Sequence, residues 1–353
     1  MFLVKAQLIL ENGERYSGEM FGEPKDVVGE VVFTTGMTGY QEMFTDSSYA
    51  GQIVTMTFPM IGNYGINHED NKADKVSLKA VIMREKCDSP SNFRSEMTLD
   101  EFLKEQGVTA LCGIDTRVLT KSIRDNGVMK GVIMKGEPSE EEVAKMLASF
   151  DNSGLVMQTT VTEEYEINQE GNKHIACLDL GAKDVILDEL VKCGYKVTVF
   201  PANTTAEKIL AKNPDYVIIT EGPGSPLDIA EIIEEIKKLT GKVPVCAIGL
   251  GHQALALALG CEVQKLKFGH HGANQPVKDL LGTRVYVTSQ NHNYVVTELA
   301  KGVIKTFENV NDGTCEGIFN KDLKVLGLQF RPEAVGGELD IDTILNSFLG
   351  EVK

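Results

Sequence analysis

The chain lacks the features that would place it in a membrane or on nucleic acid. No stretch of its 353 residues approaches the roughly 20 apolar residues that a membrane-spanning helix needs. Basic residues are scarce, because 35 Lys and Arg stand against 51 Asp and Glu, for a formal net charge of −16. Nucleic acids and anionic membranes are bound by clustered Lys and Arg. The charge balance therefore disfavours both as main partners.

Paired cysteines are also missing. The seven cysteines are scattered, odd in number and without a C-x-x-C pair, which argues against a disulfide framework and against a thiolate zinc site. A reducing compartment is indicated. Lys5, Gln7 and Glu11 interrupt the apolar run at the N-terminus, so this segment predicts a strand rather than a signal peptide. We expect a cytoplasmic protein.

The composition predicts two domains, 1–150 and 151–353. A hydrophobic content of 42% is enough for a sizeable core. The first part carries strand-like segments at 5–10, 30–35, 53–58 and 76–83, and many Gly and Asn turns. Two helices with good start signals are predicted, over 98–106 after Thr98 and within the acidic segment 136–150. We therefore expect an N-terminal mixed α/β domain.

In the second part, strands alternate with helices. Apolar strands are predicted at 174–180, 196–200, 216–220, 243–248 and 325–330, with a helix over 183–193. Such alternation is typical of a largely parallel sheet flanked by helices on both faces. Ligand sites in such sheets lie at the carboxyl ends of the strands. The loop 221–224 and the turn at Gly249 should therefore line one crevice.

The segment 244–260, PVCAIGLGHQALALALG, has the layout of a nucleophile elbow without a nucleophile. It predicts a buried strand, a sharp turn at Gly249 and an Ala/Leu-rich helix. Acyl-transfer enzymes place a Ser or Cys at this apex, where backbone N–H groups and the helix N-terminus favour an oxyanion. Gly249 has no side chain that could attack a carbonyl.

Several motifs together resemble one family. They are AIGLGHQ at 247–253, RPE at 331–333, MTGYQE at 37–42, TDSSYAGQ at 45–52, IGNYG at 61–65 and GIDTR at 113–117. The first two are similar to class I glutamine amidotransferases. The others resemble the small subunit of carbamoyl phosphate synthase. The resemblance spans nearly the whole chain, and it implies a class I glutamine amidotransferase domain in the second half.

The resemblance also implies a catalytic triad that this chain does not complete. The family has Cys at the elbow apex and His in the C-terminal triplet, where this chain has Gly249 and Arg331; Glu333 is kept. Neither replacement can attack a carbonyl or accept a proton near neutral pH. Cys246 should be buried and uncharged in its strand, and His252 also occurs in relatives with a complete triad. Neither is expected to replace the missing groups.

The residues that match the family's glutamine pocket are mostly retained. They are Ser48, Gly222, Gly224, Leu250, Gln253, Asn291, Asn293 and Tyr294. Two departures concern the pocket: Glu221 stands where the family has Asn, and Asn293 stands where it has Gly. The first adds a charge at the rim, and the second adds a side chain to the pocket.

A metal site is not expected on this chain. His270 and His271 lie in the run FGHHGAN at 268–274, but further ligands at metal spacing are lacking nearby, so a structural role is favoured. Nothing resembles a P-loop. The resemblance implies that ATP and metal bind to a large subunit, and that no cofactor belongs to this chain.

The resemblance implies a small subunit that hydrolyses glutamine and delivers ammonia to the large subunit, which makes carbamoyl phosphate for arginine and pyrimidines. The altered triad predicts that this chain has lost its own glutaminase activity. Two alternatives remain: a non-catalytic structural or regulatory subunit of an ammonia-using synthase, and a free-standing glutamine-binding sensor.

Overall fold

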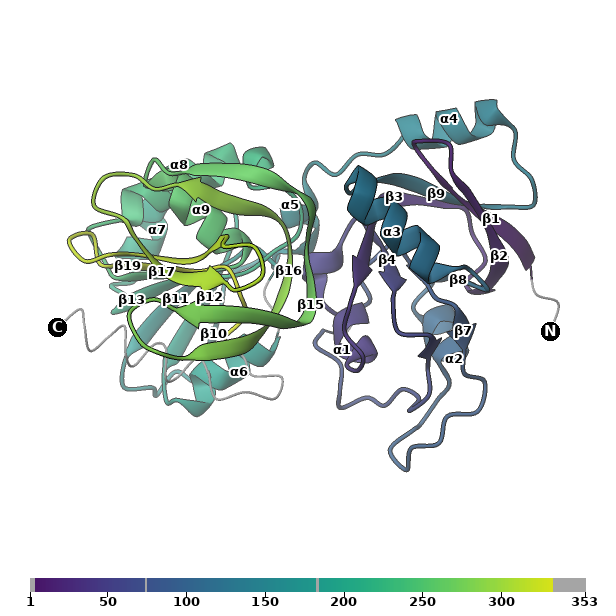
Figure 1. Cartoon of the computed structure of the whole chain (residues 1–353). Coiled ribbons are helices and arrows are strands. Elements are labelled where there is room, and N and C mark those ends of the chain that lie inside the picture. The colour runs from purple at the N-terminus through teal and green to yellow at the C-terminus, as the bar shows by residue number, and fades with distance from the viewer. Residues whose placement is uncertain (1–3, 74, 182–183, 333–353) are drawn as a thin grey trace. The chain divides into compact units, whose positions relative to one another are not determined.

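The computed structural model describes residues 4–73, 75–181 and 184–332. The chain divides into two compact units, Met1–Asn152 and Ser153–Lys353 (Figure 1). In the part of the chain that the structure describes, every helix is too short or too polar to cross a membrane.

The first unit is built on a closed barrel of seven strands. In barrel order these are β1 (Val4–Leu10), β2 (Arg15–Gly22), β8 (Thr109–Cys112), β6 (Ala80–Ile82), β4 (Gln52–Met56), β3 (Val27–Thr34) and β9 (Met129–Lys135), which pairs again with β1. Closure leaves the barrel without an exposed edge strand. The predicted strands at 5–10, 30–35 and 53–58 are confirmed within a few residues, whereas only three residues of the segment 76–83 form a strand.

Short helices surround this barrel. They are α1 (Tyr40–Phe44), the 3-10 helix η1 (Ser47–Tyr49), α2 (Leu99–Glu105), α3 (Thr116–Asn126) and α4 (Glu140–Ala148), and the small strands β5 (Met60–Ile61) and β7 (Glu85–Lys86) pair beside them. Capping boxes start α2 and α4: Thr98 pairs with Glu101, and Ser139 pairs with Glu142. The side chain of each first residue accepts from a backbone N–H that the helix leaves unpaired. Both predicted helices are confirmed.

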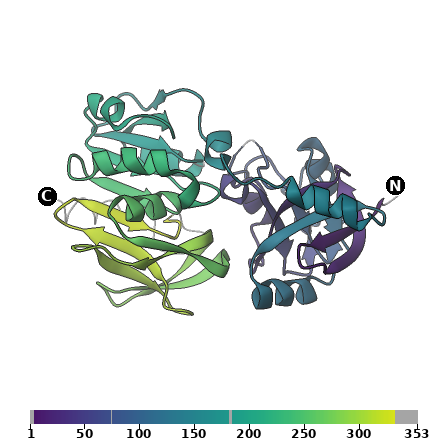
Figure 2. The same cartoon turned by 90° about the horizontal axis from the view of Figure 1, so that it is seen from above.

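The second unit contains one sheet of ten strands. Its order is β10 (Tyr165–Ile167), β12 (Lys196–Pro201), β11 (His174–Asp179), β13 (Tyr216–Ile219), β14 (Val245–Ile248), β19 (Val325–Leu328), β18 (Cys315–Asn320), β16 (Val285–Glu298), β15 (Glu262–Asp279) and β17 (Ile304–Asn309). The strands from β12 to β19 in this order are parallel, as the alternation of strands and helices predicted. The antiparallel strands β15 to β18, green to yellow in Figure 2, were not predicted.

Helices cover both faces of the parallel strands. Consecutive residues of a strand, such as Ile218 and Ile219, point to opposite faces of the sheet. Each face has its own buried apolar cluster. One cluster includes residues of α7 (Ala206–Ala211), α8 (Ala230–Leu239) and α9 (Leu250–Ala258), and the other includes residues of α6 (Asp184–Lys192) (Figure 1). The short helices α5 (Leu155–Thr159) and η2 (Pro226–Asp228) complete the unit.

Candidate active site

The turn between β14 and α9 has the backbone geometry of an elbow. Gly249 is its only residue, with φ 56° and ψ −116°. Residues other than glycine adopt such angles at a cost of about 1 to 3 kcal/mol. The N–H of Gly249 donates to the carbonyl of Leu328 on β19 at 2.8 Å, and its carbonyl accepts from the N–H of Gln253 at 3.2 Å. The chain therefore keeps the shape of the turn although the apex has no side chain.

Three altered positions meet at this turn. Glu221, Gly249 and Arg331 follow the neighbouring parallel strands β13, β14 and β19, so they lie at the same edge of the sheet. Nε of Arg331 donates to Oε2 of Glu221 at 2.6 Å, and the two side chains are only 12% and 8% exposed. A Cβ added at Gly249 would lie 3.0 Å from Cβ of Glu221, which is closer than most real contacts. The site therefore holds a buried ion pair beside an empty apex.

These three departures are far apart in the sequence, which does not show that they are in contact. The signal available was the complementary charge of Glu221 and Arg331, two of the departures from the family pattern. Such buried pairs are stable only while both partners are present, because an unpaired buried charge costs several kcal/mol. A change at one of the two positions thus constrains the other.

Steric constraints explain the two glycines in the loop 221–224, which follows β13. A Cβ at Gly222 would lie 2.3 Å from the carbonyl oxygen of Leu180, so no side chain fits there. Gly224 has φ 89°, a value that side chains disfavour. These packing constraints account for both glycines in the absence of any ligand.

The residues expected to contact glutamine from the elbow helix already have protein partners. Leu250 is buried in the core beneath α7 and α8. The side-chain amide of Gln253 donates to the carbonyl of Tyr294 at 2.9 Å and to the side chain of Gln329 at 3.1 Å. Gln253 thereby ties α9 to β16 and to the end of β19.

Asn291 and Asn293 lie on β16 and share one partner. Nδ1 of His271 lies 2.6 Å from Oδ1 of Asn291, and its Nε2 lies 3.0 Å from Oδ1 of Asn293. Because residues two apart on a strand face the same side, both amides flank the same ring. Asn293, which replaces the expected Gly, is therefore held by His271.

Two expected site residues lie outside the part of the second unit that the structure describes. Ser48 lies in η1 of the first unit, where it is buried and its N–H donates to Oδ1 of Asp46 at 3.0 Å. Glu333 lies outside the described residues.

Cys246 and His252 have the properties expected of packed core residues. Cys246 is 3% exposed on β14, and burial raises the pKa of its thiol to about 12. His252 is fully buried on α9, and burial lowers the pKa of its ring to about 3. Near pH 7 the thiol is therefore not a thiolate and the imidazole is not a practical proton acceptor.

Comparison with known proteins agrees with this architecture. Residues 8–133 match the family described as carbamoyl-phosphate synthase small chain, CPSase domain, and residues 176–350 match glutamine amidotransferase class-I. The carbamoyl phosphate synthase small chain of Clostridium perfringens is 50% identical, over 98% of this chain and 99% of the relative. That of Caldanaerobacter subterraneus is 46% identical, over 98% and 96%.

The name of a third relative includes the term pyrimidine-specific. The carbamoyl phosphate synthase pyrimidine-specific small chain of Halalkalibacterium halodurans is 43% identical, over 98% of this chain and 96% of the relative. Matches of this identity and coverage extend through both units of the chain. The chain belongs to the family of carbamoyl phosphate synthase small chains.

Proposed function

We propose that this chain acts as the small subunit of a carbamoyl phosphate synthase but does not hydrolyse glutamine. One observation supports this most directly: the elbow apex is Gly249, and the position expected for the general base is Arg331, which is paired with Glu221. Glutamine hydrolysis through a thioester requires a thiolate at the apex and a group that accepts its proton. A guanidinium cannot accept a proton near neutral pH.

Among the residues that the structure describes, the side chains near the turn offer no substitute. Cys246 is a buried thiol with a raised pKa, and the carboxylate of Glu221 is engaged by Arg331. The chain therefore keeps the elbow as a structural turn. Its contribution to the synthase would be to complete and stabilise the complex, while the large subunit uses ammonia, ATP and bicarbonate.

The test is ammonia release from glutamine by the purified chain, alone and with its large subunit. A relative with Cys at the apex serves as the positive control. We expect no release above the background of the large subunit alone, while the complex makes carbamoyl phosphate from added ammonium. Turnover close to that of the control would contradict the proposal and would require an unrecognised nucleophile.

We further propose that the first unit contributes to binding of the large subunit. The unit carries a cavity of about 740 Å³ lined by four cationic side chains, Arg84, Arg117, Lys121 and Arg124, and no carboxylate is among the described residues that line it. In a chain with a net charge of −16, such a cluster favours a complementary acidic surface. Carbamoyl phosphate from the complex would serve arginine or pyrimidine synthesis in the cytoplasm.

The free-standing sensor makes a different prediction. It requires glutamine to bind without a partner, whereas Gln253, Asn291 and Asn293 already have hydrogen-bond partners within the protein. Calorimetric titration with glutamine, together with co-purification of the large subunit, separates the two. Tight glutamine binding without co-purification would support the sensor.

A further inference from the structure

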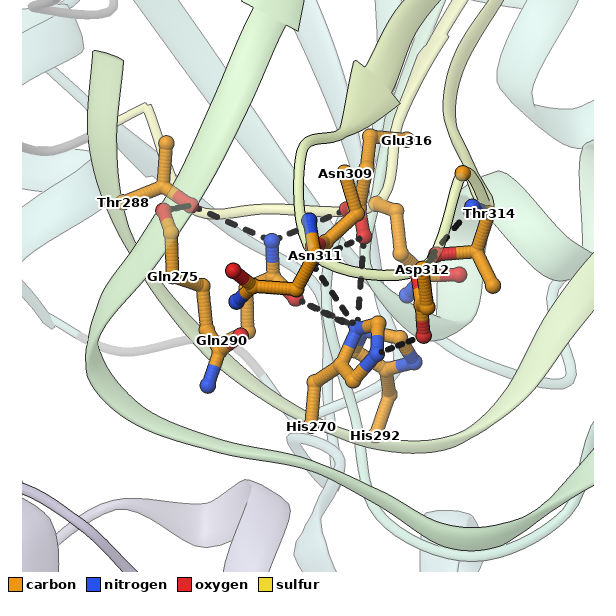
Figure 3. Close-up of polar contacts among 12 residues, drawn as sticks. His270, Gln275, Thr288, Gln290, His292, Asn309, Asn311, Asp312, Thr314 and Glu316 are labelled. Carbon is orange, nitrogen blue, oxygen red and sulfur yellow. Dashed lines mark hydrogen bonds and ion pairs between the residues drawn. The ribbon is translucent and has the colours of Figure 1, made fainter.

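Three buried side chains from different strands converge on the side of β16 opposite to Asn291 and Asn293. They are His270 on β15, His292 on β16 and Glu316 on β18, which are 7%, 7% and 0% exposed. One ligand atom from each lies within 4.8 Å of the others. Figure 3 shows both imidazoles below the carboxylate, with the side chain of Gln290 to their left. The chain spacing of these residues gave no sign of this, because the sheet brings them together.

The outer nitrogen of each ring has a partner that accepts a hydrogen bond. Nε2 of His270 lies 2.9 Å from Oδ2 of Asp312, and Nδ1 of His292 lies 2.8 Å from the carbonyl oxygen of Tyr294. These nitrogens therefore carry the proton in the neutral rings. The inner nitrogens, Nδ1 of His270 and Nε2 of His292, are then left with lone pairs that point into the cluster.

The groups opposite these lone pairs are acceptors as well. Both inner nitrogens lie 3.0 Å from Oε1 of Gln290, and Nδ1 of His270 lies 3.3 Å from Oε1 of Glu316. The Gln290 amide is oriented by its Nε2, which donates to Oε2 of Glu316 at 2.9 Å and to Oγ1 of Thr288 at 3.1 Å. Four acceptor atoms thus face one another in a buried space.

Among the described contacts, one further donor faces these atoms, and its hydrogen bonds are weak. Nδ2 of Asn309 lies 3.4 Å from Nδ1 of His270 and 3.3 Å from Oε1 of Glu316, both long for a hydrogen bond. Buried acceptors that face one another are unfavourable unless a proton or a cation lies between them. The arrangement requires such a species.

We propose that His270, His292 and Glu316 bind a Zn²⁺ ion, with Oε1 of Gln290 as the fourth ligand. Imidazole and carboxylate groups are ordinary zinc ligands, and bonds of about 2.1 Å place tetrahedral ligands about 3.4 Å apart. Three of the six separations among these four atoms, 3.0, 3.0 and 3.3 Å, are close to that spacing, and the ligand atoms of the three side chains all lie within 4.8 Å of one another. Burial of all three side chains leaves no open position, so the ion is structural.

The groups around the ligands support the same assignment. Metal-bound histidines commonly donate their other ring N–H to a carboxylate or a backbone carbonyl, which fixes the ring. Asp312 and the carbonyl of Tyr294 do this here. The carboxylates of Glu316 and Asp312 would also balance the two charges of the ion. The ion would join three strands, β15, β16 and β18, behind the amides of Asn291 and Asn293.

The experiment uses the full-length chain without a histidine tag. Zinc is measured by mass spectrometry after purification, and the chelator-stripped protein is then titrated with Zn²⁺ and with Co²⁺, whose visible absorption reports tetrahedral ligands. We expect one zinc per chain. Glu316→Gln should bind more than about 100-fold more weakly, and Asp312→Asn about 10- to 100-fold more weakly. His68→Gln changes an exposed histidine and should bind as the unaltered chain does.

A metal-free alternative has a distinct result. If the Gln290 amide is reversed and Glu316 is protonated, hydrogen bonds alone satisfy the cluster. The stripped protein would then show no cobalt absorption and no rise in melting temperature with zinc, and Glu316→Gln would be as stable as the unaltered chain. Any one of these results overturns the zinc site. If Glu316→Gln does not fold, His292→Gln replaces it, and its loss of zinc-dependent stabilisation is compared with His68→Gln.

Discussion

At the residue scale, the proposed loss of glutaminase activity concerns Gly249 and the ion pair of Glu221 with Arg331 beside it. This ion pair lies at the edge of the sheet where the carboxyl ends of β13 and β19 meet the elbow. Each side chain is almost fully buried, so each depends on the other for charge balance.

Breaking the ion pair from one side should destabilise the protein strongly. Arg331→Met removes the cation that the buried carboxylate of Glu221 contacts, at a cost of about 3 to 5 kcal/mol. The double variant Glu221→Gln with Arg331→Met removes both charges and should cost much less. Urea unfolding of the two single variants and the double variant measures the coupling. Single costs that simply add would show that the pair is not coupled.

Restoring glutamine hydrolysis should need three changes. Gly249→Cys alone leaves the cationic Arg331, and the new Cβ would lie 3.0 Å from Cβ of Glu221. Adding Arg331→His leaves Glu221 without its partner beside the thiol. Adding Glu221→Asn as well should raise ammonia release from glutamine at least about tenfold over the double variant, about 1.4 kcal/mol of barrier. Full activity of Gly249→Cys alone would contradict this account.

His252 should make the protein sensitive to acid. Its pKa is about 3 in the folded protein and about 6.5 when exposed, so below pH 6.5 the unfolded chain binds more protons than the folded one. Stability is then fully present above pH 6.5 and falls by up to about 1.4 kcal/mol per pH unit down to pH 3.

Replacing His252 removes its own contribution to this dependence. The drop in melting temperature between pH 7.5 and pH 5.5 should be smaller for His252→Leu than for the unaltered chain. His68→Gln should keep the full drop, because His68 is exposed. Equal drops for all three proteins would show that His252 does not govern acid stability.

At the scale of the elements, the elbow helix α9 is fixed by its close approach to the strand beside it. A Cβ at Gly251 would lie 2.6 Å from the carbonyl oxygen of Ile219 and 2.7 Å from that of Thr220. Gly251→Ala should therefore destabilise the protein by about 1 to 3 kcal/mol through overpacking. Gly36→Ala is the control, since its added Cβ would meet nothing closer than 3.6 Å. Similar thermal stability of the two variants would contradict the packing argument.

The sequence allowed the parallel strands and the capped helices to be predicted because their signals are local. Thr98 and Ser139 start their helices through contacts three residues away. The closed barrel and the antiparallel strands β15 to β18 depend on pairing between distant segments. Strand β15, for example, has a polar, glycine-containing sequence with irregular register against β16, so periodicity gave no clear signal.

For the site, too, the sequence predicted the local features and not the contacts between distant residues. The turn at Gly249 could be located because strand, glycines and helix are consecutive in the chain. The contact of Glu221 with Arg331 spans 110 positions, and the cluster of His270, His292 and Glu316 joins three strands. Contacts of this kind follow from the sheet order, which a single sequence does not determine.

At the scale of the whole molecule, charge is unevenly distributed. The chain is strongly acidic, yet the cavity beside α3 is lined by Arg84, Arg117, Lys121 and Arg124. The charge-reversal pair Arg117→Glu and Lys121→Glu should weaken binding of the large subunit at least about tenfold, mainly by slowing association, and should reduce its salt dependence. Lys237→Glu on the exposed side of α8 is the control. Unchanged affinity of the double variant, measured by surface plasmon resonance, would exclude this cavity as a binding surface.

The proposed loss of glutamine hydrolysis at the elbow would also have a consequence for nitrogen supply. A synthase whose small subunit releases no ammonia depends on ammonia dissolved in the cell, which competes with every other consumer and is lost by diffusion. Its output would follow the ambient ammonium concentration, and glutamine levels would not control it. Two buried side chains in one subunit would thereby decide which nitrogen source the whole complex responds to.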